Sequence, residues 1–177
     1  MAASSARVLL TTFTKHRGYA EIPGLFKKTG CRVEVHCPAR SGLLRNRSWD
    51  ERHSFMYTPE AYLVSLQTLI AKGYEWIVVT DDETLKLLKD TLDDDTARRI
   101  LPFSKRESMQ VIGSKAGLER ACQRCGIPTP RSFILQNGDI EKALQNLTFP
   151  LLLKLDYSWG GKGIHLCSSK DQLVART

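Results

Sequence analysis

The sequence predicts an α/β protein, because strand-like and helix-like segments alternate along its first hundred residues. Short apolar or alternating runs are followed by amphipathic runs that stop at glycine, in the order strand, helix, strand, helix, strand, helix. This alternation favours a parallel sheet with right-handed crossovers. At 177 residues, the chain is long enough for one domain, or for one domain and part of another.

Local signals place the elements of this first block. Pro23 is tolerated in the first turn of a helix and Gly30 ends it, whereas 32–36 alternates polar and apolar residues as a strand does. The expected strands are 8–13, 32–36 and 76–80, the expected helices are 22–29, 59–72 and 81–90, and 37–58 is expected to be irregular. Ligands of such sheets bind beyond the carboxyl ends of the strands, here at 12–16 and 80–83. Neither stretch contains the G-x-G-x-x-G fingerprint of a dinucleotide site.

The pattern changes near Leu101 and Pro102, which predicts a second, smaller α+β part. Ser114 is a good N-cap for a helix that Gly126 ends. Two apolar strands on either side of a glycine-rich turn predict a hairpin with a flexible tip. The expected helices of this part are 106–112, 114–124, 139–146 and 170–175, and the expected strands are 131–135, 151–156 and 164–167.

Basic residues outnumber acidic ones by 26 to 19, and the net charge of +7 indicates a polyanionic partner. The charge is blocky, with +6 in 1–53, −6 in 54–97 and +7 in 98–177, and this argues against a protein that coats nucleic acid. The composition excludes a disordered or collagen-like chain, and no apolar run approaches the length of a membrane helix. Five thinly spread cysteines favour reduced thiols and a cytoplasmic location.

The stretch from Lys154 to Gly163 carries the most chemical information. Its glycines allow backbone N–H groups to converge on a phosphate. Lys154 lies in an apolar strand and shares a face with Leu152, so its ammonium group needs an anion or a route to solvent. Gly163 follows Lys162 where a P-loop requires Ser or Thr, so the stretch is not a Walker A motif. A plain hairpin turn with an edge-strand lysine is the alternative to a phosphate site.

The order of several motifs resembles the ATP-grasp superfamily of ligases. Ser114-Lys115 opens a helix that ends in Gly-Ile-Pro-Thr-Pro (126–130), and Phe-Pro-Leu-Leu-Leu-Lys (149–154) leads into Ser-Trp-Gly-Gly-Lys-Gly (158–163). This series is similar to the first half of the nucleotide-binding part of those ligases. The resemblance implies a Rossmann-like domain at 1–102, followed by an incomplete α+β ATP-grasp subdomain at 103–177.

The resemblance also implies roles by position. Lys115 matches the lysine that contacts ATP phosphate at the start of the first helix, and Lys154 matches the strand lysine that reaches the α- and β-phosphates. The residues that match the mobile loop over the terminal phosphates are Ser158, Gly160, Gly161, Lys162 and Gly163. Two ammonium groups and a nest of amides would oppose the triphosphate charge, and the loop would close to exclude water. The alternative for Lys115 is an exposed lysine in a first helical turn, where the helix dipole disfavours it mildly.

ATP-grasp ligases place their adenine-contacting hinge, their Mg²⁺-binding Glu and Asn and an Arg that assists acyl-phosphate formation downstream of this loop. The resemblance therefore implies the N-terminal fragment of a carboxylate–amine ligase that is not competent by itself. It implies weak or absent ATP binding by the fragment, with Mg²⁺ and a small-molecule carboxylate expected only in the complete parent. The alternative is a non-catalytic nucleotide-binding or protein-interaction module, whose exposed half-domain surface would favour self-association.

The remaining candidate sites have weaker patterns. Cys122 and Cys125 form C-x-x-C, but at the end of a helix, and no second cysteine pair has zinc spacing. The histidines show no ligand spacing, although His16 follows the first strand, where it could line a pocket. The arginine-rich stretch 40–52 is interpreted as a solvated loop, with carboxylate or nucleic-acid binding as the alternative, and 93–95 as a helix cap.

Overall fold

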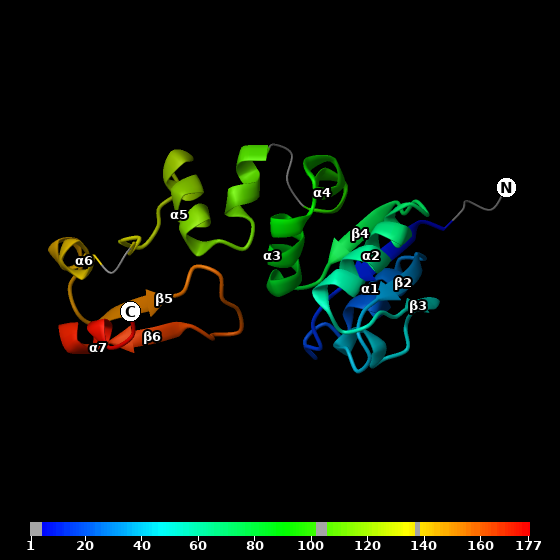
Figure 1. Ribbon diagram of the computed structural model, residues 1–177, viewed down its shortest axis with the longest axis horizontal. Coiled ribbons are helices and arrows are strands. Elements are labelled where there is room, and N and C mark those ends of the chain that lie inside the picture. The colour runs from blue at the N-terminus through cyan, green and yellow to red at the C-terminus, as the bar shows by residue number, and fades with distance from the viewer. Residues whose placement is uncertain (1–4, 102–105, 137–138) are drawn as a thin grey trace. The chain divides into compact units, whose positions relative to one another are not determined.

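The computed structural model describes residues 5–101, 106–136 and 139–177, and the chain divides into two compact units, Met1–Arg106 and Glu107–Thr177 (Figure 1). Unit 1 contains a four-stranded sheet and unit 2 a two-stranded one. The predicted boundary between residues 102 and 103 lies outside the described residues. Within those residues, no helix has both the length and the apolar character needed to cross a membrane.

Unit 1 is built on a parallel sheet with the strand order β3-β2-β1-β4. Its elements are β1 (Arg7–Thr11), α1 (Ile22–Lys28), β2 (Arg32–His36), the 3₁₀ turn η1 (Gly42–Leu44), β3 (Glu51–His53), α2 (Pro59–Ile70), β4 (Trp76–Val79), α3 (Asp82–Thr91) and α4 (Asp94–Ile100). Strand order 3-2-1-4 occurs in doubly wound Rossmann sheets, which bind ligands at their carboxyl edge. The predicted α/β fold with a parallel sheet is confirmed.

One stretch of unit 1 differs from its prediction. The segment 37–58 was expected to be irregular, but it contains β3, which pairs in parallel with β2 through Glu34↔Glu51 and His36↔His53. A strand of three polar residues carries no hydrophobic alternation, so its sequence gives no strand signal. The strand forms because it pairs with β2, whose partner residues lie 17 positions earlier in the sequence.

The two faces of the sheet have different chemistry, since successive side chains of a strand point to opposite sides. Val8, Leu10, Val33 and Val35 are buried on one face, where Ile22 and Phe26 of α1 pack against the core. Removal of this apolar surface from water is the main stabilising contribution on that side.

The opposite face carries buried polar groups that are satisfied by α2. Thr11 Oγ1 lies 2.9 Å from Tyr62 Oη and 3.0 Å from His36 Nδ1, and His36 Nε2 lies 3.1 Å from Ser65 Oγ. Burial lowers the pKa of His36 to about 3, with a further contribution from nearby His53, so the ring is neutral near pH 7. Helices therefore cover both faces of the sheet.

Glu34 is a buried carboxylate on the same face as His36. Its oxygens lie 3.0 Å from Arg7 Nη2, 2.9 Å from His53 Nε2 and 2.7 Å from Tyr74 Oη. Burial by itself would raise the pKa of Glu34, but the hydrogen bonds from His53, Tyr74 and Arg7 outweigh it and lower the pKa to about 2. Glu34 is therefore ionised at neutral pH and links β2 to β1 and β3.

Unit 2 is a β-hairpin with short helices. Its elements are η2 (Arg106–Val111), α5 (Lys115–Arg124), α6 (Ile140–Asn146), β5 (Leu151–Lys154), β6 (Ile164–Cys167) and α7 (Lys170–Val174). The predicted antiparallel hairpin is present, with Leu152 opposite Leu166 and Lys154 opposite Ile164. The strand expected at 131–135 is absent from the described residues, because this segment pairs with no neighbouring strand and Ser132 bonds instead to Glu119 and to Pro130 O.

Candidate functional site

The loop between β5 and β6 has a backbone that requires glycine. Gly160, Gly161 and Gly163 have φ angles of 58°, 76° and 71°, in the left-handed region that side chains disfavour. A Cβ on Gly163 would also come within 2.7 Å of Leu155 Cδ1. The loop is closed at its base by a 2.8 Å hydrogen bond from Leu155 N to Gly163 O. Lys162 and the first two of these glycines are exposed at the tip, and the Lys162 N–H donates a 3.1 Å hydrogen bond to Trp159 O within the loop.

Lys154 lies at the end of β5 next to this loop, on the exposed face of the hairpin. Alternation places it with Leu152, Ile164 and Leu166, which are 56%, 40% and 62% exposed. No hydrogen bond or ion pair joins the Lys154 ammonium to any residue that the structure describes. An unpaired cation thus adjoins an exposed apolar surface. Of the two conditions that the sequence set for the Lys154 ammonium group, an anion or access to solvent, the structure provides access to solvent.

Lys115 has a different environment. Its Nζ donates hydrogen bonds to Asp156 O at 3.0 Å, Ser158 O at 2.7 Å and Ser158 Oγ at 2.9 Å. An ammonium group has three N–H donors, so all three are directed at the loop. The structure therefore brings Lys115 and Ser158 together and uses the helix lysine to hold the start of the loop.

The carboxylate of Asp156 lies at the N-terminus of α5, where the helix dipole favours an anion. Its Oδ1 accepts hydrogen bonds from Ser114 Oγ and Ala116 N, both at 2.9 Å. Ser114 Oγ in turn accepts from Gly117 N at 2.8 Å, so the predicted N-cap is confirmed. Positive charge at a helix N-terminus stabilises such a carboxylate. No local sequence pattern indicates this role of Asp156, because its cap partners lie about 40 residues away.

The other sequence candidates are placed as follows. Cys122 and Cys125 are free thiols at the C-terminal end of α5, where the Cys122 carbonyl accepts from Ile127 N at 2.9 Å. Asp93 caps α4 by accepting from Asp95 N and Thr96 N, as predicted for a helix cap. The carboxyl ends of β1 and β4 do come together, since Thr12 Oγ1 donates to Asp81 Oδ2 at 2.6 Å.

A group of potential metal ligands occurs in unit 1, and among the described residues it is formed by Glu34, Glu51 and His53. The two carboxylates are already paired with guanidinium groups, because Arg7 reaches Glu34 at 3.0 Å and Arg32 reaches Glu51 at 3.1 Å. Both carboxylates thus already have cationic partners, and this group forms an ion-pair network.

No protein-family model matches the chain, and no curated protein sequence matches it at a significant level. Solved structures do match it. N5-carboxyaminoimidazole synthetase from Staphylococcus aureus complexed with ADP is 17% identical with a TM-score of 0.69, over 95% of this chain and 43% of that chain. A biotin carboxylase complex from Campylobacter jejuni is 16% identical with a TM-score of 0.63, over 98% of this chain and 40% of that chain. An L-amino acid ligase from Bacillus licheniformis is 15% identical with a TM-score of 0.62, over 97% of this chain and 41% of that chain.

These matching proteins are ATP-grasp ligases, so the resemblance inferred from the motifs is confirmed at the level of the fold. The chain spans about two fifths of the length of these proteins. At such low identity the match shows a shared fold and not a shared activity.

Proposed function

We propose that the chain is the N-terminal part of an ATP-grasp carboxylate–amine ligase, with residues 1–102 forming the preceding Rossmann-like domain and 103–177 the first part of the nucleotide-binding domain. Almost all of this chain, but only about two fifths of the matching ligases, is covered by the alignment, which supports this assignment. In the parent, a carboxylate attacks the γ-phosphorus of ATP, giving an acyl-phosphate and ADP. An amine then displaces inorganic phosphate to form the C–N bond.

The observation that carries the proposal is the free ammonium group of Lys154 on the exposed face of β5 and β6. A nucleotide offers a flat apolar base and a strongly anionic triphosphate. Leu152, Ile164 and Leu166 provide apolar surface, and Lys154 provides the charge at the end nearest the glycine-rich loop. Two of the three solved structures described above are complexes with ADP or with a β,γ-ATP compound, which supports a nucleotide as the ligand.

The loop residues would complete the phosphate site in the proposed function. Backbone N–H groups of Gly160, Gly161 and Gly163 are free of the steric limits of a Cβ and can turn toward phosphate oxygens. Lys162 adds a second cation at the exposed tip. Lys115 and Ser158 hold the loop base, so they position the loop relative to α5.

Magnesium does not fit the described residues around the loop. Asp156 is the nearby carboxylate, and its oxygens are directed at Ser114 and at the first turn of α5. Mg²⁺ requires several oxygen ligands in near-octahedral geometry. We therefore propose that Mg²⁺ binds only in the complete parent enzyme. A cytoplasmic location is part of the same proposal, supported by five cysteines that are all free thiols.

The test is a calorimetric titration of the chain with ATP. We expect saturable binding that weakens by about 10- to 100-fold in Lys154→Gln, because a charge-assisted hydrogen bond contributes roughly 1.5–3 kcal/mol. Lys28→Gln is the matched control, since Lys28 is an exposed lysine of α1 without a partner among the described residues. Equal affinity for ATP in Lys154→Gln and Lys28→Gln would contradict the proposal.

A protein-interaction module is the second candidate, and the same apolar face favours it. Exposed contiguous apolar side chains mark association sites. Light scattering coupled to size-exclusion chromatography would show oligomers that grow with concentration and that disappear in a Leu152→Ser, Leu166→Ser double variant. If ATP also dissociates these oligomers, the same face binds both ATP and a second copy of the chain. A monomer at all concentrations would exclude self-association through this face.

A further inference from the structure

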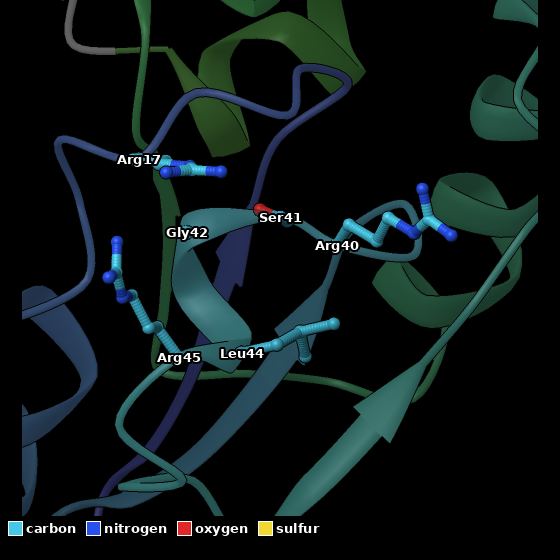
Figure 2. Close-up of a pocket in the computed structure, with 6 residues that line it drawn as sticks. All are labelled: Arg17, Arg40, Ser41, Gly42, Leu44 and Arg45. Carbon is cyan, nitrogen blue, oxygen red and sulfur yellow. The ribbon is translucent and has the colours of Figure 1, made fainter.

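A pocket of about 380 Å³ lies in unit 1, at the carboxyl edge of the parallel sheet (Figure 2). It is formed by the loop after β1 and by the segment after β2. Its lining residues are Arg17, Arg40, Ser41, Gly42, Leu44 and Arg45. Loops at this edge of a parallel sheet are the usual place for a ligand, because they follow the strand ends that converge there.

The arginines of this pocket have no carboxylate partner among the described residues, whereas three other basic residues of unit 1 do. Lys27, Arg7 and Arg32 each have a carboxylate partner, in Asp50, Glu34 and Glu51. By contrast, the described residues offer no hydrogen-bond or ion-pair partner to the guanidinium groups of Arg17, Arg40 and Arg45. Like charges gathered around one concavity repel one another, and an anion between them removes that repulsion.

The arrangement of the pocket depends on an unusual local backbone. A Cβ on Gly42 would lie 2.5 Å from His16 O, which accepts a 3.1 Å hydrogen bond from Gly42 N. This close approach brings the loop of Arg17 against the turn that carries Arg45. Arg40 has a φ of 68°, in the left-handed region where a non-glycine residue is strained by about 1–2 kcal/mol. Strain of this kind clusters at ligand sites.

We infer that Arg17 and Arg45 form a binding site for a small oxyanion, a carboxylate or a phosphate group of a ligand held by unit 1. Figure 2 shows both guanidinium groups near the Gly42 turn, whereas the Arg40 side chain extends away from them and contributes charge at the rim. A guanidinium fork matches the two oxygens of a carboxylate or phosphate with parallel N–H donors. Leu44 also lines the pocket, while it packs against the hydrophobic core of unit 1.

This site goes beyond the proposed nucleotide function, because it uses residues of unit 1 alone. The proposed phosphate lysines, Lys115 and Lys154, belong to unit 2. The two sites can therefore fail independently, and the experiment is chosen to keep them apart.

The test is a nuclear magnetic resonance titration of the ¹⁵N-labelled chain with sodium phosphate and, separately, with sodium succinate, at constant ionic strength and without nucleotide. The reporters are the backbone amides of Gly42 and Arg45 and the arginine Nε–H signals. The variant is an Arg17→Gln, Arg45→Gln double substitution. Its control is Arg98→Gln, Arg99→Gln, which removes the same charge from two exposed arginines of α4 that lack partners in the described chain.

We expect saturable shifts in the wild type and in the control, with affinity at least about tenfold weaker in the Arg17 and Arg45 variant. Tighter binding of succinate would identify a carboxylate as the natural group, and tighter binding of phosphate would identify a phosphate. Shifts that never saturate, or an equal loss in both double variants, would overturn the inference, since they indicate general charge screening. If Arg17→Gln perturbs folding, Arg45→Lys keeps the charge without the fork and should still weaken binding. A Lys154→Gln variant should leave the phosphate response unchanged while it weakens ATP binding.

Discussion

Removal of the Asp156 carboxylate should loosen the N-terminus of α5. Its Oδ1 accepts from Ser114 Oγ and from Ala116 N, both at 2.9 Å. Hydrogen bonds to a charged group contribute roughly 1.5–3 kcal/mol when shielded, and a carboxylate at a helix N-terminus adds roughly 0.3–1 kcal/mol. Asp156 is exposed to solvent, so we discount the sum to about 2 kcal/mol for Asp156→Ala.

Amide hydrogen exchange measures this loss locally, which matters because a chain of two units need not unfold in one step. A change of about 2 kcal/mol corresponds to roughly 30-fold faster exchange of the α5 amides in Asp156→Ala. Asp156→Asn keeps an acceptor oxygen and loses the charge, so we expect a loss of about 1 kcal/mol and roughly fivefold faster exchange. Asp171→Ala removes a first-turn carboxylate from α7 and should leave α5 unchanged. Exchange in Asp156→Ala within about twofold of the wild type would refute the reasoning.

Three further predictions concern the buried carboxylate, the loop backbone and the helix lysine. Because the pKa of Glu34 falls from 4.5 to about 2 on folding, its ionisation contributes about 3 kcal/mol, fully present above about pH 4.5 and lost as the pH falls toward 2. Urea unfolding followed over pH should show that the difference in stability between wild type and Glu34→Gln shrinks through that window; a constant difference would contradict it. Gly163→Ala should destabilise unit 2 by about 1–2 kcal/mol, measured by thermal unfolding, since a Cβ there meets Leu155 and φ is positive; an unchanged melting temperature would show that the loop has another conformation. Lys115→Ala should release the loop, so trypsin should cut after Lys162 about tenfold faster by mass spectrometry, while substitution of the free strand lysine leaves this rate unchanged.

The sequence predicted well where a local pattern decides the structure. Ile164–Cys167 and Arg32–His36 have the predicted bounds, because apolar alternation and flanking turns define a strand without reference to distant residues. It predicted poorly where pairing decides. The strand β3 is polar and exists through its register with β2, and the apolar segment 131–135 lacks a neighbour and is not a strand.

The same distinction applies to the candidate site. Alternation along β5 predicted the face of Lys154, since the period of two residues is a property of the strand itself. The partners of Lys115 lie 41 and 43 residues away, and no local pattern indicates that its ammonium would bond to the loop. The arginine pocket likewise depends on the approach of Gly42 to His16, which joins two loops from different strands.

The two lysines of the proposed nucleotide site are therefore not equivalent. All three N–H donors of Lys115 are directed at Asp156 and Ser158, so a phosphate oxygen can bind this ammonium group only if one of those hydrogen bonds breaks. Lys154 has no such partner and can bind an anion without rearrangement of its neighbours. In the proposed function, the strand lysine makes the first contact with phosphate. Transfer of Lys115 from the loop carbonyls to a phosphate would then release the base of the loop, and this links nucleotide binding to loop movement through a single side chain.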